Sequence, residues 1–327
     1  MKMKMKNGNT ALLFWLTSIA LIASGCGSSG SGGSANSGAG VTVNGEGGNT
    51  TLPFTSFSDL RPNTNYEADA ISVGSSYTYD TDDFRVDSIG STILDSSGTV
   101  TIGYGDLFLE RFFQENSIAS FSINSSDGDD IFFDNDSSII FVSKDRAIDG
   151  IFMATEDLGW DYQTFGVWRT GVNTGSGYAG ATSFGYATPI SDIPISGGAS
   201  YFGSSSGIYV DSDGADYFTY SNVSAFTDFS RQRISFETDN TLIIDRASFI
   251  SSPDYFSSVS APGLDFSGEL SFDRQSGLGS GKATSISGLE GNINSRFYGP
   301  RAEEVGGVFE LRGEGVEAYQ GAFGASR

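Results

Sequence analysis

Hydrophobic and polar residues alternate along much of the chain from Leu52 onward. Between residues 264 and 273, hydrophobic residues or glycine occupy the even positions and polar residues the odd positions, and shorter stretches at 119–124 and 234–237 show the same period of two. Because successive side chains of a β-strand point to opposite faces, this pattern is typical of half-buried antiparallel strands. We find no stretch with the 3.6-residue period of an amphipathic helix.

Turn-forming residues recur between these stretches about every 8–12 positions, for example in the runs SSSG (204–207) and DSDG (211–214). Gly, Ser, Asn and Asp favour turns because they tolerate unusual backbone angles or bond to their own backbone. The sequence therefore predicts an all-β fold built from hairpins. Its 26 Phe and 14 Tyr residues supply large side chains for the core.

The composition changes near residues 171–180, where glycine is frequent, and the stretch 187–198 that follows contains two prolines. Such sequence is typical of a connection between folded parts. We therefore predict a first β-rich domain over residues 52–179 and a second domain over residues 180–327.

The N-terminus is typical of a targeting segment. Lys2, Lys4 and Lys6 precede an apolar stretch at 11–22, which is too short for a membrane-spanning helix of roughly 20 residues. Residues 21–26, LIASGC, then resemble the lipobox of bacterial lipoproteins. This resemblance implies that residues 1–25 are a signal peptide, that cleavage falls between Gly25 and Cys26, and that lipid is attached to Cys26.

Cys26 is the single cysteine of the chain, so no disulfide can form within it. The alternative interpretation is a secreted protein with a stray free thiol, which would be a liability in an oxidising compartment. The Gly/Ser-rich residues 26–51 are predicted to be a tether, with an r.m.s. span of roughly 25–30 Å. Gly27 after the cysteine is compatible with export to the outer membrane.

Four segments of the second half carry a further resemblance: 184–207, 224–236, FYGPRAEEVGGVFEL at 297–311 and GAFGASR at 321–327. They are similar to the β-barrel lobe of the transferrin-binding protein B family of surface lipoproteins. The run WDYQTFGVW at 160–168 is similar to the segment that leads from that family's handle domain into its barrel. The resemblance covers roughly 145 C-terminal residues well and extends weakly to about Leu52.

The resemblance implies an eight-stranded antiparallel β-barrel preceded by a smaller β-rich handle domain. Only one such pair is present, whereas the full transferrin receptor has two lobes. We interpret the motif residues as structural, because glycines permit turns or close backbone approach and aromatic rings fill a barrel of this size. These residues are Phe297, Tyr298, Gly299, Pro300, Glu303, Gly306, Gly307, Phe309 and Phe323.

The charge and composition exclude several kinds of function. The formal net charge of −22 has the wrong sign for binding phosphate groups, so neither nucleic acid nor an anionic membrane surface is an expected partner. Because the chain has no histidine, Ser-His-Asp catalysis, imidazole zinc sites and histidine-ligated haem are all excluded. We predict that the protein is not an enzyme and needs no cofactor, with carboxylate-based hydrolysis as a weak alternative.

Two clusters could still hold a ligand. The aspartate-rich stretches 125–136 and 211–216 could attract calcium, but neither has the spacing of a calcium loop, and we favour solvated turns and no metal. The aromatic residues Trp160, Tyr162, Phe165 and Trp168 could stack on a flat ligand such as haem, or could form core, which we favour.

The sequence thus predicts a lipid-anchored outer-membrane protein that faces the cell exterior. The resemblance implies a host protein or an iron or haem source as ligand, bound by loops of the handle and barrel, and a TonB-dependent receptor as a partner; another solute is also possible. The alternative is a structural, shielding surface lipoprotein whose acidity keeps it soluble. The sequence does not identify the ligand-binding residues.

Overall fold

The computed structural model describes residues 40–43, 50–53, 55–59, 65–80, 85–103, 108–112, 123, 128–134, 138–153, 160–172, 174–245 and 257–327. The predicted signal peptide, Gly25, Cys26 and most of the predicted tether lie outside the described residues. All described residues belong to one compact unit, Ser37–Arg327. Among them no helix combines the length and the hydrophobicity needed to cross a membrane.

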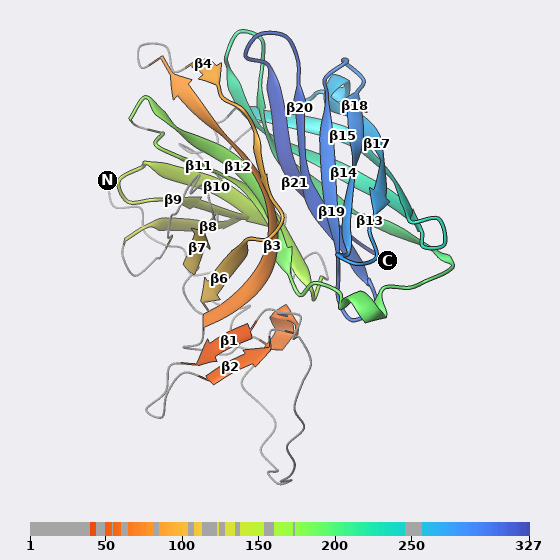
Figure 1. Ribbon diagram of the computed structural model, residues 1–327. Helices are drawn as coiled ribbons and strands as arrows, with labels where there is room; N and C mark the ends of the chain where they lie inside the picture. The colour runs from red at the N-terminus through yellow and green to blue at the C-terminus, as the bar shows by residue number, and fades with distance from the viewer. Residues whose placement is uncertain are drawn as a thin grey trace. The chain divides into compact units, whose positions relative to one another are not determined.

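The first sheet has twelve strands and is organised around the long strand β3. Its strands are β1 (Gly40–Val43), β2 (Thr50–Pro53), β3 (Asn65–Tyr79), β4 (Val86–Ile89), β5 (Ile93–Asp95), β6 (Thr99–Gly103), β7 (Phe108–Phe112), β8 (Asp130–Asp134), β9 (Ser138–Val142), β10 (Ile148–Met153), β11 (Gln163–Thr170) and β12 (Ser176–Gly185). The main order is β2-β1-β3-β12-β11-β10-β9-β8, while β4, β5 and β6 also pair with β3, and β7 with β6. β3 and β12 pair antiparallel along their length (Figure 1).

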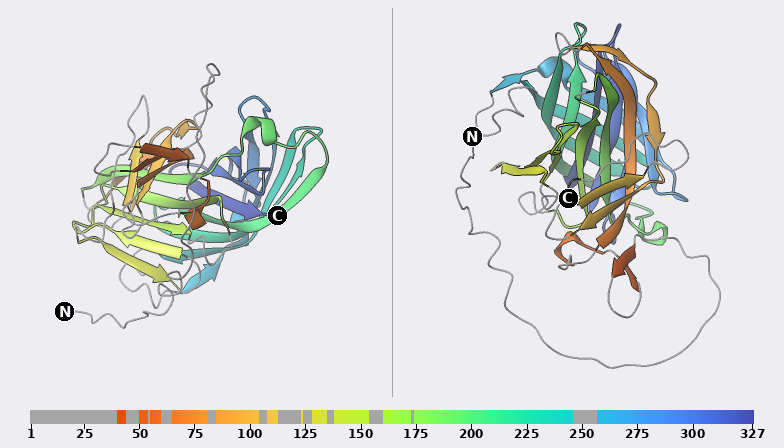
Figure 2. Two further views of the ribbon diagram at one scale, coloured as in Figure 1. Left: turned by 90° about the horizontal axis from the view of Figure 1, so that it is seen from below. Right: turned by 90° about the vertical axis from the view of Figure 1, so that its left-hand side faces the viewer.

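The second sheet closes on itself as a barrel. Its strands are β13 (Gly198–Val210), β14 (Asp216–Asp228), β15 (Arg233–Asp245), β16 (Ser258–Ser260), β17 (Phe266–Phe272), β18 (Leu278–Ser285), β19 (Glu290–Tyr298), β20 (Glu304–Arg312) and β21 (Ala318–Ser326). The order is β14-β13-β21-β20-β19-β18-β17-β15-β16, and pairing of β14 with β15 closes the ring (Figure 2). Eight strands form the closed barrel, and the short β16 pairs with β15 outside the ring. The predicted all-β fold with an eight-stranded antiparallel barrel is confirmed.

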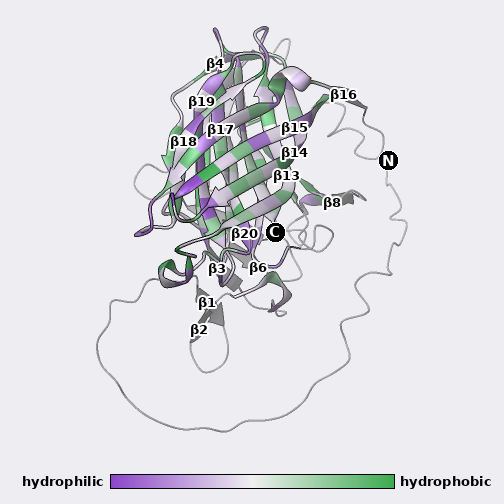
Figure 3. Ribbon diagram, turned by 90° about the vertical axis from the view of Figure 1, so that its right-hand side faces the viewer, coloured by the Kyte–Doolittle hydropathy of each residue, from purple (hydrophilic) through white to green (hydrophobic). Residues whose placement is uncertain are grey.

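The barrel wall shows the predicted period of two. In β15 and β17, buried residues alternate with exposed ones, and hydrophobic and hydrophilic positions alternate along the strands that face the viewer in Figure 3. The inward residues are largely aromatic, and their rings touch: the centroids of Phe236 and Phe323 lie 4.5 Å apart and those of Phe266 and Phe309 4.6 Å apart. Each buried ring of this kind stabilises the fold by roughly 1.5–3 kcal/mol. The barrel interior is therefore packed core along its length, as expected for eight strands.

The barrel strands end at two rims, which we name for the orientation of Figure 1. The upper rim comprises the connections 211–215, 258–265, 286–289 and 313–317 with the strand ends beside them. The lower rim comprises the connections 186–197, 229–232, 273–277 and 299–303, the C-terminal Arg327 and the strand ends beside them, including residues 198–202 of β13 and 226–228 of β14. Three short 3-10 turns complete the described elements: η1 (Phe57–Asp59), η3 (Ile190–Asp192) and η4 (Pro262–Leu264).

Two details of the predicted strands and turns can be compared directly. The run SSSG at 204–207, predicted as a turn, lies inside β13, so this prediction was wrong; its serines are buried because small side chains fit a wall that is covered on both sides. The run DSDG does form the turn between β13 and β14. The predicted strand at 119–124 lies outside the described residues except for the buried Ile123.

The division into domains of 52–179 and 180–327 stays a prediction. The structure places β12, which spans Ser176–Gly185, in the first sheet and begins the barrel at Gly198. The connection between them contains η3 and the two prolines that suggested a boundary.

Candidate functional site

The first sheet packs against the outer wall of the barrel along a contact that we call the seam. Phe165 and Val167 on β11 share one hydrophobic core with Ile208 on β13, Val308 on β20 and Ala322 on β21. The opposite face of β11 is also covered, because Trp168 packs in a separate core with rings such as Phe141 and Phe184. β11 is therefore buried on both faces, and the seam holds the two sheets together.

Motif residues on β20 form the lower end of the seam. The carboxylate of Glu304 accepts hydrogen bonds from the backbone N–H groups of Asp161, at 2.9 Å, and Tyr162, at 3.3 Å, just before β11 begins. Next to it, the amide of Gln163 donates to the carbonyl of Val305 at 3.1 Å. Burial raises the pKa of Glu304 to about 7, although the backbone N–H groups oppose this shift.

The turn between β19 and β20 fastens the connection that follows β12. Gly299 has a φ of +85°, which favours glycine, and its N–H donates to the carbonyl of Tyr186 at 2.9 Å. The hydroxyl of Thr188 donates to the carbonyl of Gly299 at 2.7 Å. Pro300 is exposed in the turn, and Glu303 accepts the N–H of Arg301 at 2.6 Å. A hydrogen bond within the turn therefore stabilises its conformation, and its bonds to Tyr186 and Thr188 fix the connection that leads into the barrel.

The other motif residues are buried in the wall and interior of the barrel. Phe297, Phe309 and Phe323 belong to the interior core, and the hydroxyl of Tyr298 lies 3.0 Å from that of Ser183 on β12. Gly307 does not have a positive φ; a side chain there would collide with the backbone of Asn294 on β19. Gly307 therefore permits close backbone approach between β19 and β20 and does not form a turn.

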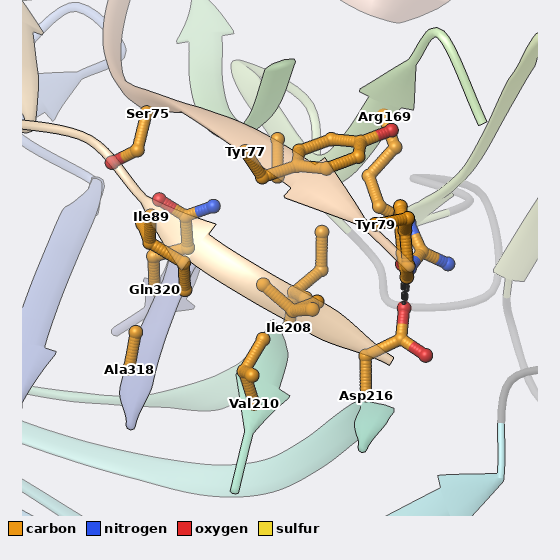
Figure 4. A pocket seen from close by; sticks show the side chains of 12 residues that line it. Ser75, Tyr77, Tyr79, Ile89, Arg169, Ile208, Val210, Asp216, Ala318 and Gln320 are labelled. Carbon is orange, nitrogen blue, oxygen red and sulfur yellow. Dashed lines mark hydrogen bonds and ion pairs between the residues drawn. The ribbon is translucent and has the colours of Figure 1, made fainter. Parts of the chain in front are cut away.

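A buried charge cluster joins the two sheets at the upper end of the seam (Figure 4). Arg169 on β11 is 2% exposed; its Nε lies 3.1 Å from the carboxylate of Asp149 on β10, and its Nη1 pairs with Asp216 on β14. The hydroxyl of Tyr79 bonds to Asp216 and accepts a bond from Arg169 at 2.8 Å. The cavity beside the cluster holds about 20 Å3, room for one water molecule. This cluster is therefore a structural link.

A larger groove lies between the segment 92–94 of the first sheet and the outer wall of the barrel. Its volume is about 380 Å3, which falls in the range of small-ligand sites. Its lining residues are Val73, Thr92, Leu94, Ser280, Gly281, Lys282, Asn292, Asn294, Val308, Phe309 and Glu310. We call this the seam groove and take it as the candidate ligand site.

Polar contacts brace the seam groove at both ends. At the upper end, the Nη2 of Arg312 donates to Thr92 at 2.8 Å and to Ser75 at 2.9 Å, while Thr92 donates to Glu310 at 2.6 Å. Further down, Arg296 donates to the carbonyl of Ser96 at 2.7 Å. The segment that forms one wall is therefore held against the barrel independently of any ligand.

The groove offers hydrogen-bond donors beside one carboxylate, that of Glu310. The ammonium of Lys282 donates to Asn292 at 2.8 Å, and the amide of Asn292 donates to Glu310 at 3.2 Å. Among the described contacts, the amide of Asn294 has no hydrogen-bond partner. Leu94, 46% exposed, supplies an apolar wall. This arrangement suits a small group that carries a carboxylate or hydroxyls beside a hydrocarbon part.

Of the residues that line the seam groove, sequence reasoning singled out only Phe309, and it did so as a structural residue of the barrel. Asn292 and Asn294 alternate with inward residues on β19, so they look like ordinary outward positions of a strand. The groove exists because Thr92 and Leu94, nearly two hundred residues earlier, lie opposite them. The resemblance of the β19–β20 motif marked the neighbouring seam but not the groove.

The aspartate-rich stretches do not converge on a metal site among the described residues. Asp211 accepts the N–H groups of Asp213 and Ala215 at 3.0 and 2.9 Å, as in a self-bonded turn, while Asp216 turns toward Arg169. Asp129 accepts the N–H of Lys144 at 2.8 Å. Asp127 and Asp136 lie outside the described residues.

The aromatic group near β11 is core, as favoured from the sequence. Trp160, Phe165 and Trp168 are at most 4% exposed, and the rings of Trp160 and Phe165 lie 5.4 Å apart. The indole of Trp168 donates to Thr182 at 3.1 Å. Only Tyr162 of this group is partly exposed.

Comparison with known protein families identifies the barrel. Residues 193–327 match the model described as the C-lobe and N-lobe beta barrels of Tf-binding protein B. Residues 193–327 of this chain are therefore similar to the barrels of transferrin-binding protein B. The resemblance read from the β19–β20 motif is thereby confirmed for this part of the chain.

Solved structures of transferrin-binding protein B are similar to the chain. One is a point mutant from Haemophilus parasuis Hp5, with 12% identity, a TM-score of 0.42, and coverage of 72% of this chain and 54% of that one. Another, from serogroup B Neisseria meningitidis, has 14% identity, a TM-score of 0.43 and coverage of 72% and 52%. A point mutant from Actinobacillus pleuropneumoniae H49 has 12% identity, a TM-score of 0.41 and coverage of 79% and 99%.

The chain thus spans about half of the length of the first two of these transferrin-binding proteins. No curated protein matches the sequence.

Proposed function

We propose that the protein is a lipoprotein of the outer membrane, anchored through Cys26 and exposed to the cell exterior, that binds a host protein, an iron or haem source, or another solute. The observation that carries this proposal is the transferrin-binding protein B barrel at residues 193–327, preceded by a β-sheet that packs on its wall. The lipobox-like residues before Cys26 support the anchor. Binding without catalysis fits a chain that has no histidine.

The seam groove and the upper rim are the proposed binding surfaces. The groove would hold a small group that bears a carboxylate or hydroxyls near Lys282 and Asn294. The upper rim would meet a cationic partner surface, because Asp213, Glu314 and other carboxylates are exposed there. A TonB-dependent receptor in the same membrane is the proposed partner that receives the ligand, as the family resemblance implies.

The proposal is tested by capture with the mature chain in which Cys26 is replaced by Ser. The immobilised protein is incubated with host fluid or growth medium, and a bound protein or solute is identified and titrated. We expect saturable binding. For a protein ligand the association rate should fall with salt more than the dissociation rate changes, because the Debye length shortens from about 10 Å at 0.1 M to about 3 Å at 1 M. Recovery of nothing saturable at low salt would instead favour the shielding role.

The groove is tested separately with the captured ligand. We expect Lys282→Ala together with Asn294→Ala to weaken binding about tenfold or more, because each removes a donor from the groove. Lys144→Ala, an exposed lysine on the turn before β10, is the matched control for loss of one positive charge. Equal affinities of both variants would place the ligand outside the groove.

A further inference from the structure

The two rims of the barrel differ strongly in charge. On the described upper rim three arginines, Arg312 of the barrel with Arg85 and Arg169 of the first sheet, accompany eight carboxylates: Asp211, Asp213, Asp216, Asp245, Asp265, Glu290, Glu314 and Glu317. On the lower rim five arginines accompany five carboxylates: Arg231, Arg233, Arg274, Arg301 and Arg327 with Asp192, Asp228, Asp273, Glu303 and Glu304. Although the chain has a net charge of −22, an anionic surface repels the lower rim less than the upper rim.

The lower rim also exposes large apolar side chains. Phe202 on β13 is 65% exposed, Phe226 on β14 is 50% exposed, and Ile195 in the preceding connection is 74% exposed. Phe202 lies opposite Ser224, and Phe226 lies opposite Ser200, so both rings stand diagonally adjacent on the outer face of the wall. Burial of these rings would remove apolar surface from water.

Arginines surround this apolar group. The side chain of Arg231 is 83% exposed and that of Arg233 58% exposed, and their ion pairs with Asp228 and Glu269 are long, at 3.7 Å each. Arg327 follows Ser326, the residue opposite Phe202. Guanidinium groups bind phosphate oxygens well, and phenylalanine rings enter the boundary between lipid headgroups and chains.

The chain enters the fold at the same end. β1 pairs with β3 at Tyr66 and Asn65, the end of β3 that lies near Gly185 and the connection to the lower rim. The N–H of Phe57 in η1 donates to the carbonyl of Asp161 at 2.8 Å, and Asp161 is itself bonded to Glu304 at the lower rim. Thirteen residues lie between Cys26 and Gly40, and a Gly/Ser chain of that length has an r.m.s. span of roughly 20 Å.

We propose that the lower rim rests on the membrane that holds the anchor, with its arginines on lipid phosphates and Phe202 and Phe226 at the headgroup boundary. The proposal rests on the anchor assigned under the proposed function. It fixes the orientation of the molecule: the acidic upper rim points away from the membrane, and the seam groove opens above the contact. The surface that this inference assigns is distinct from both proposed ligand surfaces.

The test holds the mature chain to vesicles without relying on acylation. Cys26 is replaced by Ser, and an N-terminal histidine tag binds a nickel-chelating lipid in vesicles that contain phosphatidylglycerol; the chain has no histidine of its own to compete. Because Cys26 is the sole cysteine, Ser200→Cys at the lower rim or Ser287→Cys at the upper rim then carries the one environment-sensitive fluorophore. Quenchers attached to the lipid chains report which label lies near the membrane.

We expect the label at position 200 to emit at shorter wavelength and to be quenched at least threefold more than the label at position 287. Phe202→Ser with Phe226→Ser should abolish this difference, whereas Ile286→Ser, which removes a 74% exposed apolar residue from the upper rim, should not. Equal quenching at both positions, or stronger quenching at 287, would overturn the inference. Mass spectrometry of the native N-terminal peptide tests the lipid anchor separately, so failure of one proposal does not conceal failure of the other.

Discussion

The side-chain amide of Gln163 occupies the space where a side chain of Gly306 would stand. An added Cβ at Gly306 would collide with the Oε1 of Gln163, and one at Gly324 on the next strand would lie 2.6 Å from its Nε2. These two glycines therefore make a shallow slot in the barrel wall, and the first residue of β11 lies in that slot. Part of the family motif thus serves the contact between the sheets.

Gly306→Ala is expected to destabilise the protein by about 1–3 kcal/mol, because the added methyl group must displace Gln163 or Ser183 from the seam. The free energy of unfolding is measured with urea. Gly263→Ala is the control, since a Cβ there would meet only Ser287 at an ordinary 3.5 Å. Equal stability of the Gly306 and Gly263 variants would contradict the role of the slot.

Arg169→Met is expected to cost about 3–5 kcal/mol, because two buried carboxylates, Asp149 and Asp216, lose their guanidinium. The melting temperature and urea midpoint report the loss. Arg231→Met removes an arginine whose side chain is 83% exposed, and it should change stability by no more than about 0.5 kcal/mol. A loss at Arg169 as small as that at Arg231 would show that the cluster does not hold the sheets together.

The raised pKa of Glu304 predicts a pH dependence of stability. The folded group, with a pKa of about 7, keeps a proton that the unfolded group, with a pKa of 4.5, has already released. Its contribution is therefore complete below pH 4.5 and is lost as the pH rises through 7, by an amount on the order of 3 kcal/mol. In Glu304→Gln the free energy of unfolding should fall less steeply between pH 4.5 and 7.

Urea unfolding at a series of pH values measures this slope. Glu314→Gln, on an exposed connection of the upper rim, should leave the slope close to that of the unmodified protein. Parallel curves for Glu304→Gln and the unmodified protein would refute the assignment of the pH dependence to Glu304.

Cys26→Ser is expected to release the protein from the membrane fraction, because acylation is the principal source of membrane affinity in the proposal. Fractionation of cells and immunodetection of the protein measure this. The proposed lower-rim contact is too weak to retain an unanchored chain of net charge −22 after washing. Full retention of the variant in washed outer membranes would rule out the lipid anchor.

Alternation of hydrophobic and polar residues predicted the strands that pack against the core on one face and meet solvent on the other. In β17, alternation of hydrophobic and polar residues is sufficient, because each side chain faces either the barrel interior or solvent. β11 is different: its residues from Gln163 to Arg169 are all buried, since the barrel covers one face and the Trp168 core covers the other. No pattern within eight residues shows which distant surfaces will cover a strand.

The candidate site shows the same limit. The motif around Gly299 and Glu303 pointed to a special part of the barrel, and the structure places it at the lower end of the seam. Lys282 and Asn294 became candidates only because Leu94 approaches them from another sheet. A site built from side chains that are individually ordinary has no signature in a single sequence.

The pairing of the first and last strands of the barrel has a consequence for folding. β13 and β21 are neighbours, although Val210 and Phe202 meet residues more than 100 positions later, at Ala318 and Ser326. Contacts between residues this far apart in the sequence form slowly, because the chain loses conformational entropy in closing the loop before the contacts can stabilise it. A chain emerging from the ribosome therefore cannot complete its barrel until β21 has been made. In the proposed export, the barrel would therefore stay open until the last strand of the chain is available to close it.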